Sequence, residues 1–352
     1  MDIDFDFLKE LLSAPGPSSF ESRPAAVFRA RAEALGLSTR QDPYGSVFAV
    51  AGAGRGPRLL LSGHIDEIGL LVTHLDEKGL AWFTAVGSWD AQQLVGQRVR
   101  IVGRNGDVVG LIGKKPIHLM SQEDRRKVST IEDLWIDIGA SDRDDALEAI
   151  APGDVAVIEQ PLVQLRNGRI ACKAIDDRIG AYAALEVARR VAGEDLACEV
   201  VASATVQEEI GGVGASSAAY GLEPDVAIAI DVTHASDVPG IDVRKEGEHS
   251  LGSGPELSVG SYVHRGVLEA LRQTAAEASI AVTTGLAPRR TATDADHLAR
   301  TRTGVPSAVV SIPNRYMHSP NEMVDPADVA AVVELLVAFA TRLPQLHPIR
   351  QP

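Results

Sequence analysis

Five residues of this 352-residue chain carry imidazole or carboxylate groups that can bind metal ions, and a sixth acid stands beside one of them. Such ligands, without a thiolate, suit zinc, cobalt or manganese better than calcium or magnesium. Two such ions about 3.5–4 Å apart can acidify one water and polarise a carbonyl group. These residue types therefore favour hydrolysis by a metal-activated water. The candidate ligands are His64, Asp176, Glu209, Asp231 and His318, and the candidate general base is Glu208.

His64 follows the apolar run at residues 58–61, which predicts a buried strand. In an extended segment, His64 and Asp66 point to the same face. The Asp66 carboxylate can then accept the imidazole N–H and leave the other ring nitrogen for a metal. A partly buried histidine near an exposed aspartate explains this short motif equally well.

Asp176 and Asp177 follow an Asn167-Gly168 hairpin signal and open a helical run predicted at residues 179–191. Two acids at a helix start can simply be caps, because the helix dipole favours negative charge there. Taken alone, this segment leaves capping and metal binding equally open.

Glu208 and Glu209 end an apolar strand predicted at residues 198–206. Adjacent carboxylates at the end of a buried strand are costly unless they are paired or bound to cations. Neighbouring side chains on an extended backbone point to opposite faces. Glu208 is therefore expected to face away from Glu209, where it can act as a general base.

Asp231 and His318 repeat this placement, since the strands predicted at residues 226–230 and 307–312 precede them. In open α/β sheets, binding sites form at the carboxyl edge of the strands. We therefore expect all the candidate ligands to converge at or just beyond strand ends.

The ordered motifs GHIDEIG, KAIDDRIG, VQEEIGG, DVTHASDVPG and NRYMHSP resemble those of the M42 family of cocatalytic metallo-aminopeptidases, the TET aminopeptidases related to glutamyl aminopeptidase. The resemblance runs from about Leu11 to the C-terminal helix. It includes residues 114–119 and 134–140, which are similar to the family's inserted domain. The resemblance implies an α/β fold: a mixed-sheet cocatalytic zinc-peptidase domain carrying an inserted β-rich, PDZ-like or barrel-like dimerisation domain.

Carried over by motif, the resemblance implies two divalent ions per subunit, zinc or cobalt, with manganese as a further option. His64 and Asp231 would bind one ion, Glu209 and His318 the other, and Asp176 would bridge both. The family pattern also implies a cis peptide bond after Asp176.

The resemblance further implies that Glu208 and Asp66 are catalytic residues, with Glu208 as the general base towards a metal-bridging hydroxide. The substrates would be short peptides that lose their N-terminal residue. One departure concerns the rim of the substrate pocket. Residues 289–292, Arg-Arg-Thr-Ala, precede Thr293 where the family usually has a glycine-rich lead.

The chain's organisation predicts an insertion. A helix at residues 20–35 belongs to the first part of the chain, and α/β alternation resumes after residue 169, with helices near 179–191, 263–278 and 326–343. Between them, short strands at residues 97–103 and 107–113 flank an Asn105-Gly106 turn, and only residues 122–127 and 143–150 look helical. The predicted domains are a catalytic domain, 1–67 with 164–352, and a β-rich oligomerisation domain, 68–163.

The insertion contributes no candidate ligand but keeps three tryptophans, Trp82, Trp89 and Trp135. Such a domain is expected to pack against something other than its own metal centre. Together with the resemblance, this predicts a homo-oligomer, a tetrahedral dodecamer. Burial of the tryptophans in the domain's own core is the alternative.

Composition restricts the other partners. A net charge of −14 argues against nucleic acid, since phosphate binding needs a basic face. The chain lacks an unbroken apolar run of transmembrane length, so no membrane span is expected. Cys172 and Cys198 show no metal-binding spacing, and with no hydrophobic N-terminal leader they predict a reducing cytoplasm.

Two other classes remain to be weighed. Paired acids can serve a glycosidase, but its carboxyls face each other about 5–9.5 Å apart across a sugar, and 4% aromatic residues leave few sugar platforms. A non-catalytic assembly protein could keep the fold, although the intact acid set argues against it. His234 is a candidate to support the ligands, whereas no role is expected for the remaining histidines, His74, His118, His249, His264, His297 and His347.

Overall fold

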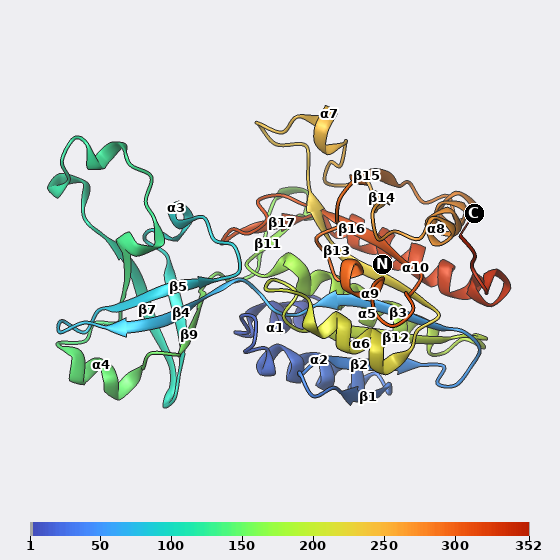
Figure 1. Cartoon of the computed structure of the whole chain (residues 1–352), viewed down its shortest axis with the longest axis horizontal. Helices are drawn as coiled ribbons and strands as arrows, with labels where there is room; N and C mark the ends of the chain where they lie inside the picture. The colour runs from blue at the N-terminus through green and yellow to red at the C-terminus, as the bar shows by residue number, and fades with distance from the viewer. Residues whose placement is uncertain (1–2, 352) are drawn as a thin grey trace.

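The computed structural model describes residues 3–351 and shows an α/β body from which a β-barrel projects (Figure 1). The body is built on an eight-stranded mixed sheet. In spatial order its strands are β1 (Ser38–Gln41), β2 (Val47–Ala51), β12 (Glu199–Thr205), β3 (Arg58–His64), β13 (Val226–His234), β16 (Ser307–Asn314), β14 (Glu256–Gly260) and β15 (Thr283–Ala287).

The four central strands β12, β3, β13 and β16 run parallel, so their carboxyl ends meet at one edge of the sheet. Nearly all of their side chains are buried, as expected for parallel strands covered on both faces. Alternation along β3 separates the two faces: Leu59 and Leu61 join one apolar cluster, and Leu60 joins another.

Helices cover both faces of this sheet. The larger cluster includes side chains from α1 (Phe5–Ser13), α2 (Ser22–Ala34), α5 (Ile175–Val191), α8 (Arg265–Glu277) and α10 (Pro326–Leu346). The opposite face is covered by α6 (Val213–Leu222) and α9 (Ala295–Leu298), while α7 (Val243–Glu246) lies on an outer excursion (Figure 1).

Within residues 3–351, α10 is the one helix long and apolar enough by composition to cross a membrane, a test that core helices also pass. No membrane span was expected because the sequence lacks an unbroken apolar run of sufficient length. In α10, the apolar run is interrupted by the charged residues Asp328, Glu334 and Arg342. Leu336 and Phe339 are fully buried in the main core.

The projecting barrel is closed by β4 (Gly69–Leu75), β5 (Ala81–Val86), β8 (Leu134–Asp137), β7 (Gly106–Lys114), β6 (Arg98–Gly103) and β9 (Val155–Ile158). It also carries α3 (Ala91–Leu94) and α4 (Arg143–Ala149), and its apolar cluster is separate from the core of the body. The rings of Trp82 and Trp135 pack 6.2 Å apart, and Trp89 packs on the barrel core. All three tryptophans contact their own domain but are only half-buried, so neither expectation for them is decided.

The β-rich insertion predicted from the sequence is thus present, as is the mixed-sheet α/β class. Two local predictions are wrong. The stretch 122–127 forms only a 3-10 turn at Asp124–Arg126, inside the long connection from β7 to β8. Strand β13 does not stop before Asp231, because its pairing with β16 continues to His234. The division of the chain into a catalytic domain, 1–67 with 164–352, and an inserted domain, 68–163, stays a prediction. Residues 1, 2 and 352, at the ends of the predicted catalytic domain, lie outside the described chain.

A buried ionic cluster lies where the chain leaves the body for the barrel. The fully buried Arg178 donates to the backbone carbonyls of Ile65 and Ala14 and to the Glu67 carboxylate, at 2.9, 2.6 and 2.9 Å. Lys173 donates to both Glu67 oxygens. Nearby, a small sheet of β10 (Val163–Gln164), β11 (Ile170–Cys172) and β17 (Glu322–Val324) returns the chain to the body. The segment leaving His64 is therefore fixed at the domain junction.

Candidate active site

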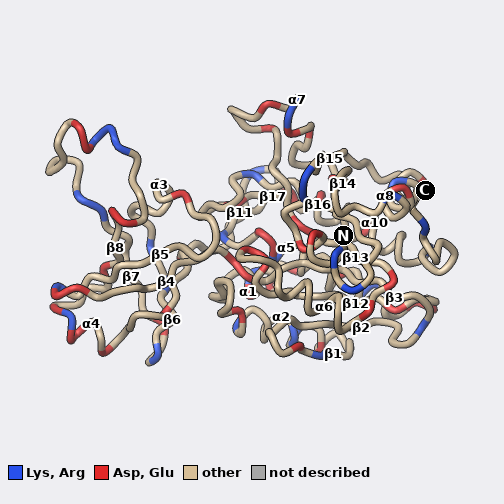
Figure 2. Tube along the Cα trace, in the orientation of Figure 1, with Lys and Arg blue, Asp and Glu red and all other residues tan. Residues whose placement is uncertain are grey.

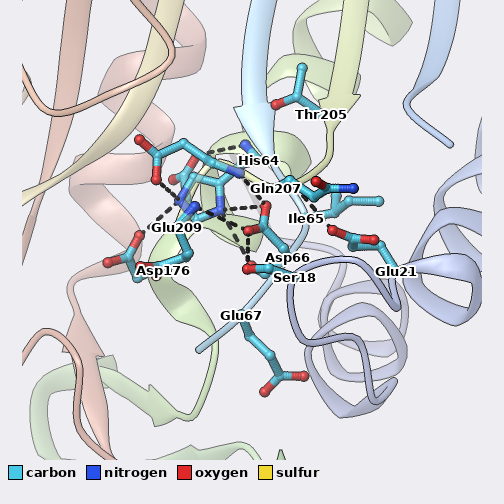
Figure 3. Close-up of polar contacts among 12 residues, drawn as sticks. Ser18, Glu21, His64, Ile65, Asp66, Glu67, Asp176, Thr205, Gln207 and Glu209 are labelled. Atoms are coloured by element: carbon cyan, nitrogen blue, oxygen red, sulfur yellow. Dashed lines mark hydrogen bonds and ion pairs between the residues drawn. The ribbon is translucent and has the colours of Figure 1, made fainter. Parts of the chain in front are cut away.

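The predicted site residues meet at the carboxyl edge of the central strands, and Figure 3 shows His64, Asp66, Asp176 and Glu209 among them. His64 is the last residue of β3, and Glu208 and Glu209 lie in the turn that follows β12. Asp176 lies at the start of α5, and the peptide bond after it is cis, as the resemblance implies. Asp231 lies within β13 and not beyond it, so the expectation of a strand end is corrected there.

Asp176 lies between the two histidines. Its Oδ1 is 3.2 Å from Nε2 of His64, and its Oδ2 is 3.4 Å from Nε2 of His318. The same His318 nitrogen is 3.3 Å from Oε1 of Glu209. The Asp176 carboxylate therefore presents one oxygen to each of the two histidines.

Asp231 belongs to the His64 side of the cluster. Ligand atoms of His64, Asp177 and Asp231 all lie within 4.8 Å of one another, as do those of His64, Asp176 and Glu209. Glu208 approaches the same centre, with its Oε2 3.9 Å from Nε2 of His64. The structure thus brings together all the residues named from the sequence.

The backbone around Glu208 differs from the expected extended strand. Gln207 has a φ of 60°, and Glu208 and Glu209 follow in a turn. Asp66 fixes this turn: its two oxygens accept hydrogen bonds from the backbone N–H groups of Glu208 and Glu209, both at 3.1 Å. The side chains of Glu208 and Glu209 therefore do not diverge because they lie on opposite faces of a strand. Instead, the turn directs them to different histidines.

Asp66 also faces His64, with Oδ1 3.4 Å from Nδ1, and accepts a hydrogen bond from the Ser18 hydroxyl at 2.7 Å. A carboxylate in this position favours the tautomer with the proton on Nδ1, which leaves Nε2 available to a metal. Burial alone would raise the pKa of Asp66, but His64 and the other donors outweigh it and hold that pKa below its usual value.

Three further buried acids support the site, and sequence reasoning gave none of them this role. Asp177 accepts the backbone N–H of His64 at 3.1 Å and that of Gly180 at 3.2 Å, so the capping alternative applies to Asp177. Glu322 accepts the N–H of Asp176 at 2.8 Å and that of His318 at 2.9 Å. Asp294 accepts the hydroxyls of Ser62 and Thr205, both at 2.6 Å.

The electrostatics of the cluster reflect buried charge. Burial raises the pKa of Glu208 and of Asp231 well above the usual range, and raises that of Glu209 as well. Contact with Asp176, and then with Glu209, raises the pKa of His318 to about 11. Several buried acids in one place lack enough positive charge to stay ionised together, and divalent cations would provide it.

The ligands form one wall of a cavity of about 640 Å³. Its other walls come from the turn after Glu209, the end of β13 and residues 290–297. His234 and His297 line this cavity as well, although no role was expected for His297. Of the segment 289–292, where the sequence departs from the family pattern, residues 290–292 therefore line the cavity.

Residues 45–335 match the family model described as M42 glutamyl aminopeptidase. The chain belongs to this family. It is a hydrolase that acts on peptides, and M42 membership implies that it removes N-terminal residues. The glycosidase and non-catalytic alternatives are thereby set aside.

The chain is similar over nearly its whole length to known aminopeptidases. It is 31% identical to lysyl aminopeptidase of Pyrococcus furiosus, covering 97% of this chain and 98% of that one. The TET aminopeptidase of Thaumarchaeota archaeon SCGC AB-539-E09 has a TM-score of 0.92 at 34% identity, with 96% of each chain covered. The TET1 peptidase of Pyrococcus horikoshii has a TM-score of 0.85 at 30% identity, covering 96% of this chain and 99% of that one.

M42 peptidases are metal-dependent, and the residues present here fit such ions. The donor set is imidazole nitrogen and carboxylate oxygen, which suits zinc, cobalt or manganese. The acids are buried, and burial disfavours their charge unless cations accompany them.

Proposed function

We propose that this protein is a dinuclear aminopeptidase that removes N-terminal residues from short peptides. His64 and Asp231 would hold one divalent ion, Glu209 and His318 the second, and Asp176 would be shared. The observation that carries this proposal is the placement of Asp176, whose two oxygens face Nε2 of His64 and Nε2 of His318 separately. Zinc or cobalt is the proposed metal, and manganese also fits the ligands.

When bound, the two ions would supply the Lewis acidity that activates a water and polarises the peptide carbonyl. Glu208 is proposed as the general base, with Asp66 as the residue that fixes its backbone and the His64 tautomer. Burial raises the pKa of Glu208 in the metal-free protein, and two bound cations would lower it again, which leaves a carboxylate able to accept a proton and pass it to the leaving amine.

The acidic wall of the cavity also suits the free amino terminus of a peptide. Glu208, Glu209, Asp176 and Asp231 all line the cavity, and an ammonium group is attracted to such carboxylates. An acetylated terminus would lack that charge. The preferred N-terminal residue is not decided by similarity, because one relative is named a lysyl enzyme and the family description names a glutamyl one.

We also propose a homo-oligomer, a tetrahedral dodecamer, in which the barrel region 68–163 forms subunit contacts. The P. horikoshii TET1 peptidase assembles into a tetrahedron or a large octahedral shell. On the barrel of this chain, Leu111 and Val109 are 55% and 56% exposed, and Ile117 and Leu119 reach 60% and 69% in the adjoining connection. Such exposed apolar groups favour association. Light scattering should give about twelve subunits per particle, and a stable monomer would contradict this.

We propose that the protein binds neither nucleic acid nor a membrane, as its composition predicts. Lys and Arg are interspersed with Asp and Glu (Figure 2), and the net charge of −14 disfavours nucleic acid. We propose a cytoplasmic enzyme without a membrane partner.

A pair of matched peptides tests the proposed activity. One peptide has a free amino terminus, and the other has the same sequence with an acetylated terminus. Mass spectrometry should show stepwise loss of N-terminal residues from the first peptide only. A chelator should abolish this activity, and added zinc, cobalt or manganese should restore it. Internal cleavage of both peptides would contradict an aminopeptidase.

A further inference from the structure

Resting on the proposed function, we infer that Arg290 makes this enzyme selective for peptides whose N-terminal residue is acidic. Arg290 lines the same cavity as His64, Glu208 and His318. Arg290 is exposed, and its side chain forms no ion pair or hydrogen bond with any other residue in the range 3–351. A cationic group therefore stands on the wall of the proposed active site with its donors available.

Hydrogen bonds to Asp296 fix the segment that carries Arg290. The buried Asp296 accepts the backbone N–H of Thr291 at 2.8 Å, the Thr291 hydroxyl at 2.6 Å and the backbone N–H of Ala292 at 3.2 Å. These bonds fix the two residues that directly follow Arg290. They also occupy the Asp296 carboxylate, so this acid is engaged by its own loop and is poorly placed to attract a basic substrate side chain.

Apart from the candidate ligands and Glu208, the wall contains one acid, Asp296, and its carboxylate is already engaged by Thr291 and Ala292. The wall also contains apolar and neutral polar groups, such as Ile210, Thr233 and Met317, and the two histidines His234 and His297. A substrate aspartate or glutamate would thus meet a guanidinium that can bind a carboxylate through two parallel hydrogen bonds. A substrate lysine would meet the same positive charge, and Asp296, the one carboxylate on this wall outside the metal cluster, is bonded to its own loop.

The effect is expected mainly in KM, because this contact lies away from the reacting bond and is the same before and during reaction. Charge-assisted hydrogen bonds of this kind change affinity by roughly 10- to 100-fold. Arg289 provides a matched control. It has the same charge, is exposed and neighbours Arg290, but is not among the residues that line the cavity.

The experiment compares kcat and KM for glutamyl, leucyl and lysyl p-nitroanilides. The wild type should favour the glutamyl substrate. Arg290→Ala should raise KM for that substrate by roughly 10- to 100-fold and leave leucyl cleavage nearly unchanged, while Arg290→Glu should reverse the order of glutamyl and lysyl substrates. Arg289→Ala should behave like the wild type.

Three results would overturn the inference: wild-type preference for the leucyl or lysyl substrate, an equal loss on all three substrates in Arg290→Ala, or the same change in Arg289→Ala. In each case, continued leucyl cleavage would leave the proposed aminopeptidase function standing. Failure of the metal-loaded wild type to cleave any of the substrates would contradict both proposals.

Discussion

Replacing Asp66 by asparagine tests how far this one carboxylate organises the site. The change preserves size but replaces one oxygen by an NH₂ group. Asp66 Oδ1 accepts the N–H of Glu208 and faces Nδ1 of His64, and Oδ2 accepts the N–H of Glu209 and the Ser18 hydroxyl. Whichever way the amide is turned, its NH₂ group must meet a backbone N–H. At least one of the two hydrogen bonds that hold the turn at Glu208 and Glu209 is therefore lost.

The size of the effect follows from those contacts. A hydrogen bond to a charged group contributes roughly 1.5–3 kcal/mol, and 1.4 kcal/mol corresponds to a factor of ten. Loss of one bond therefore predicts a fall of roughly 10- to 100-fold in metal affinity and in kcat/KM. The same range is typical when a metal-binding histidine loses its carboxylate partner. Folding should persist, because side-chain volume is unchanged and the neighbouring ionic cluster at Glu67 is untouched.

The assay measures metal affinity by competition with a chromogenic chelator, and kcat/KM on a leucyl p-nitroanilide. Asp76→Asn is the control, because Asp76 accepts two backbone N–H groups in the turn between β4 and β5, away from the cavity. The control should keep wild-type values. Wild-type metal affinity and activity in Asp66→Asn would refute the reasoning about the tautomer and the turn.

Two further variants address the base and a buried acid. Glu208→Gln should keep both metals but lower kcat by roughly 10²- to 10⁴-fold, and near-wild-type turnover would remove its assignment as general base. Burial, and then the charge of Asp66, raise the pKa of Glu21 from 4.5 to about 7, so its ionisation opposes folding. Its contribution to stability is present below pH 4.5 and is lost as the pH rises to about 7. In metal-free protein, Glu21→Gln should therefore exceed the wild type in free energy of unfolding by up to about 3 kcal/mol at pH 8 and match it near pH 4, as measured by urea titration; an equal difference at both pH values would contradict this.

Much of the site could be predicted because each ligand stands in a distinctive local pattern. Apolar strands such as 198–206 and 307–312 identify the central sheet, and their parallel arrangement makes the residues after them converge. The turn at Gln207 could not be read in the same way, because it depends on Asp66, which holds two backbone N–H groups from a distant part of the chain.

The supporting acids escape sequence reasoning for a related reason. The Glu322 carboxylate accepts a hydrogen bond from the backbone N–H of Asp176, 146 positions away. Every residue except proline has a backbone N–H, so the sequence does not show which one a carboxylate will bind. The length of β13 is likewise set by its neighbour β16 and not by its own apolar run. Arg290 becomes significant only when the fold places it on the cavity wall.

Elemental analysis of purified, metal-loaded protein tests the shared centre most directly. The wild type should contain two divalent ions per chain, and Asp176→Ala should contain close to none, because this carboxylate faces both His64 and His318. His64→Ala should mainly weaken one ion, which distinguishes a bridge from an ordinary ligand. Two ions retained in the Asp176 variant, or only one in the wild type, would contradict the dinuclear centre.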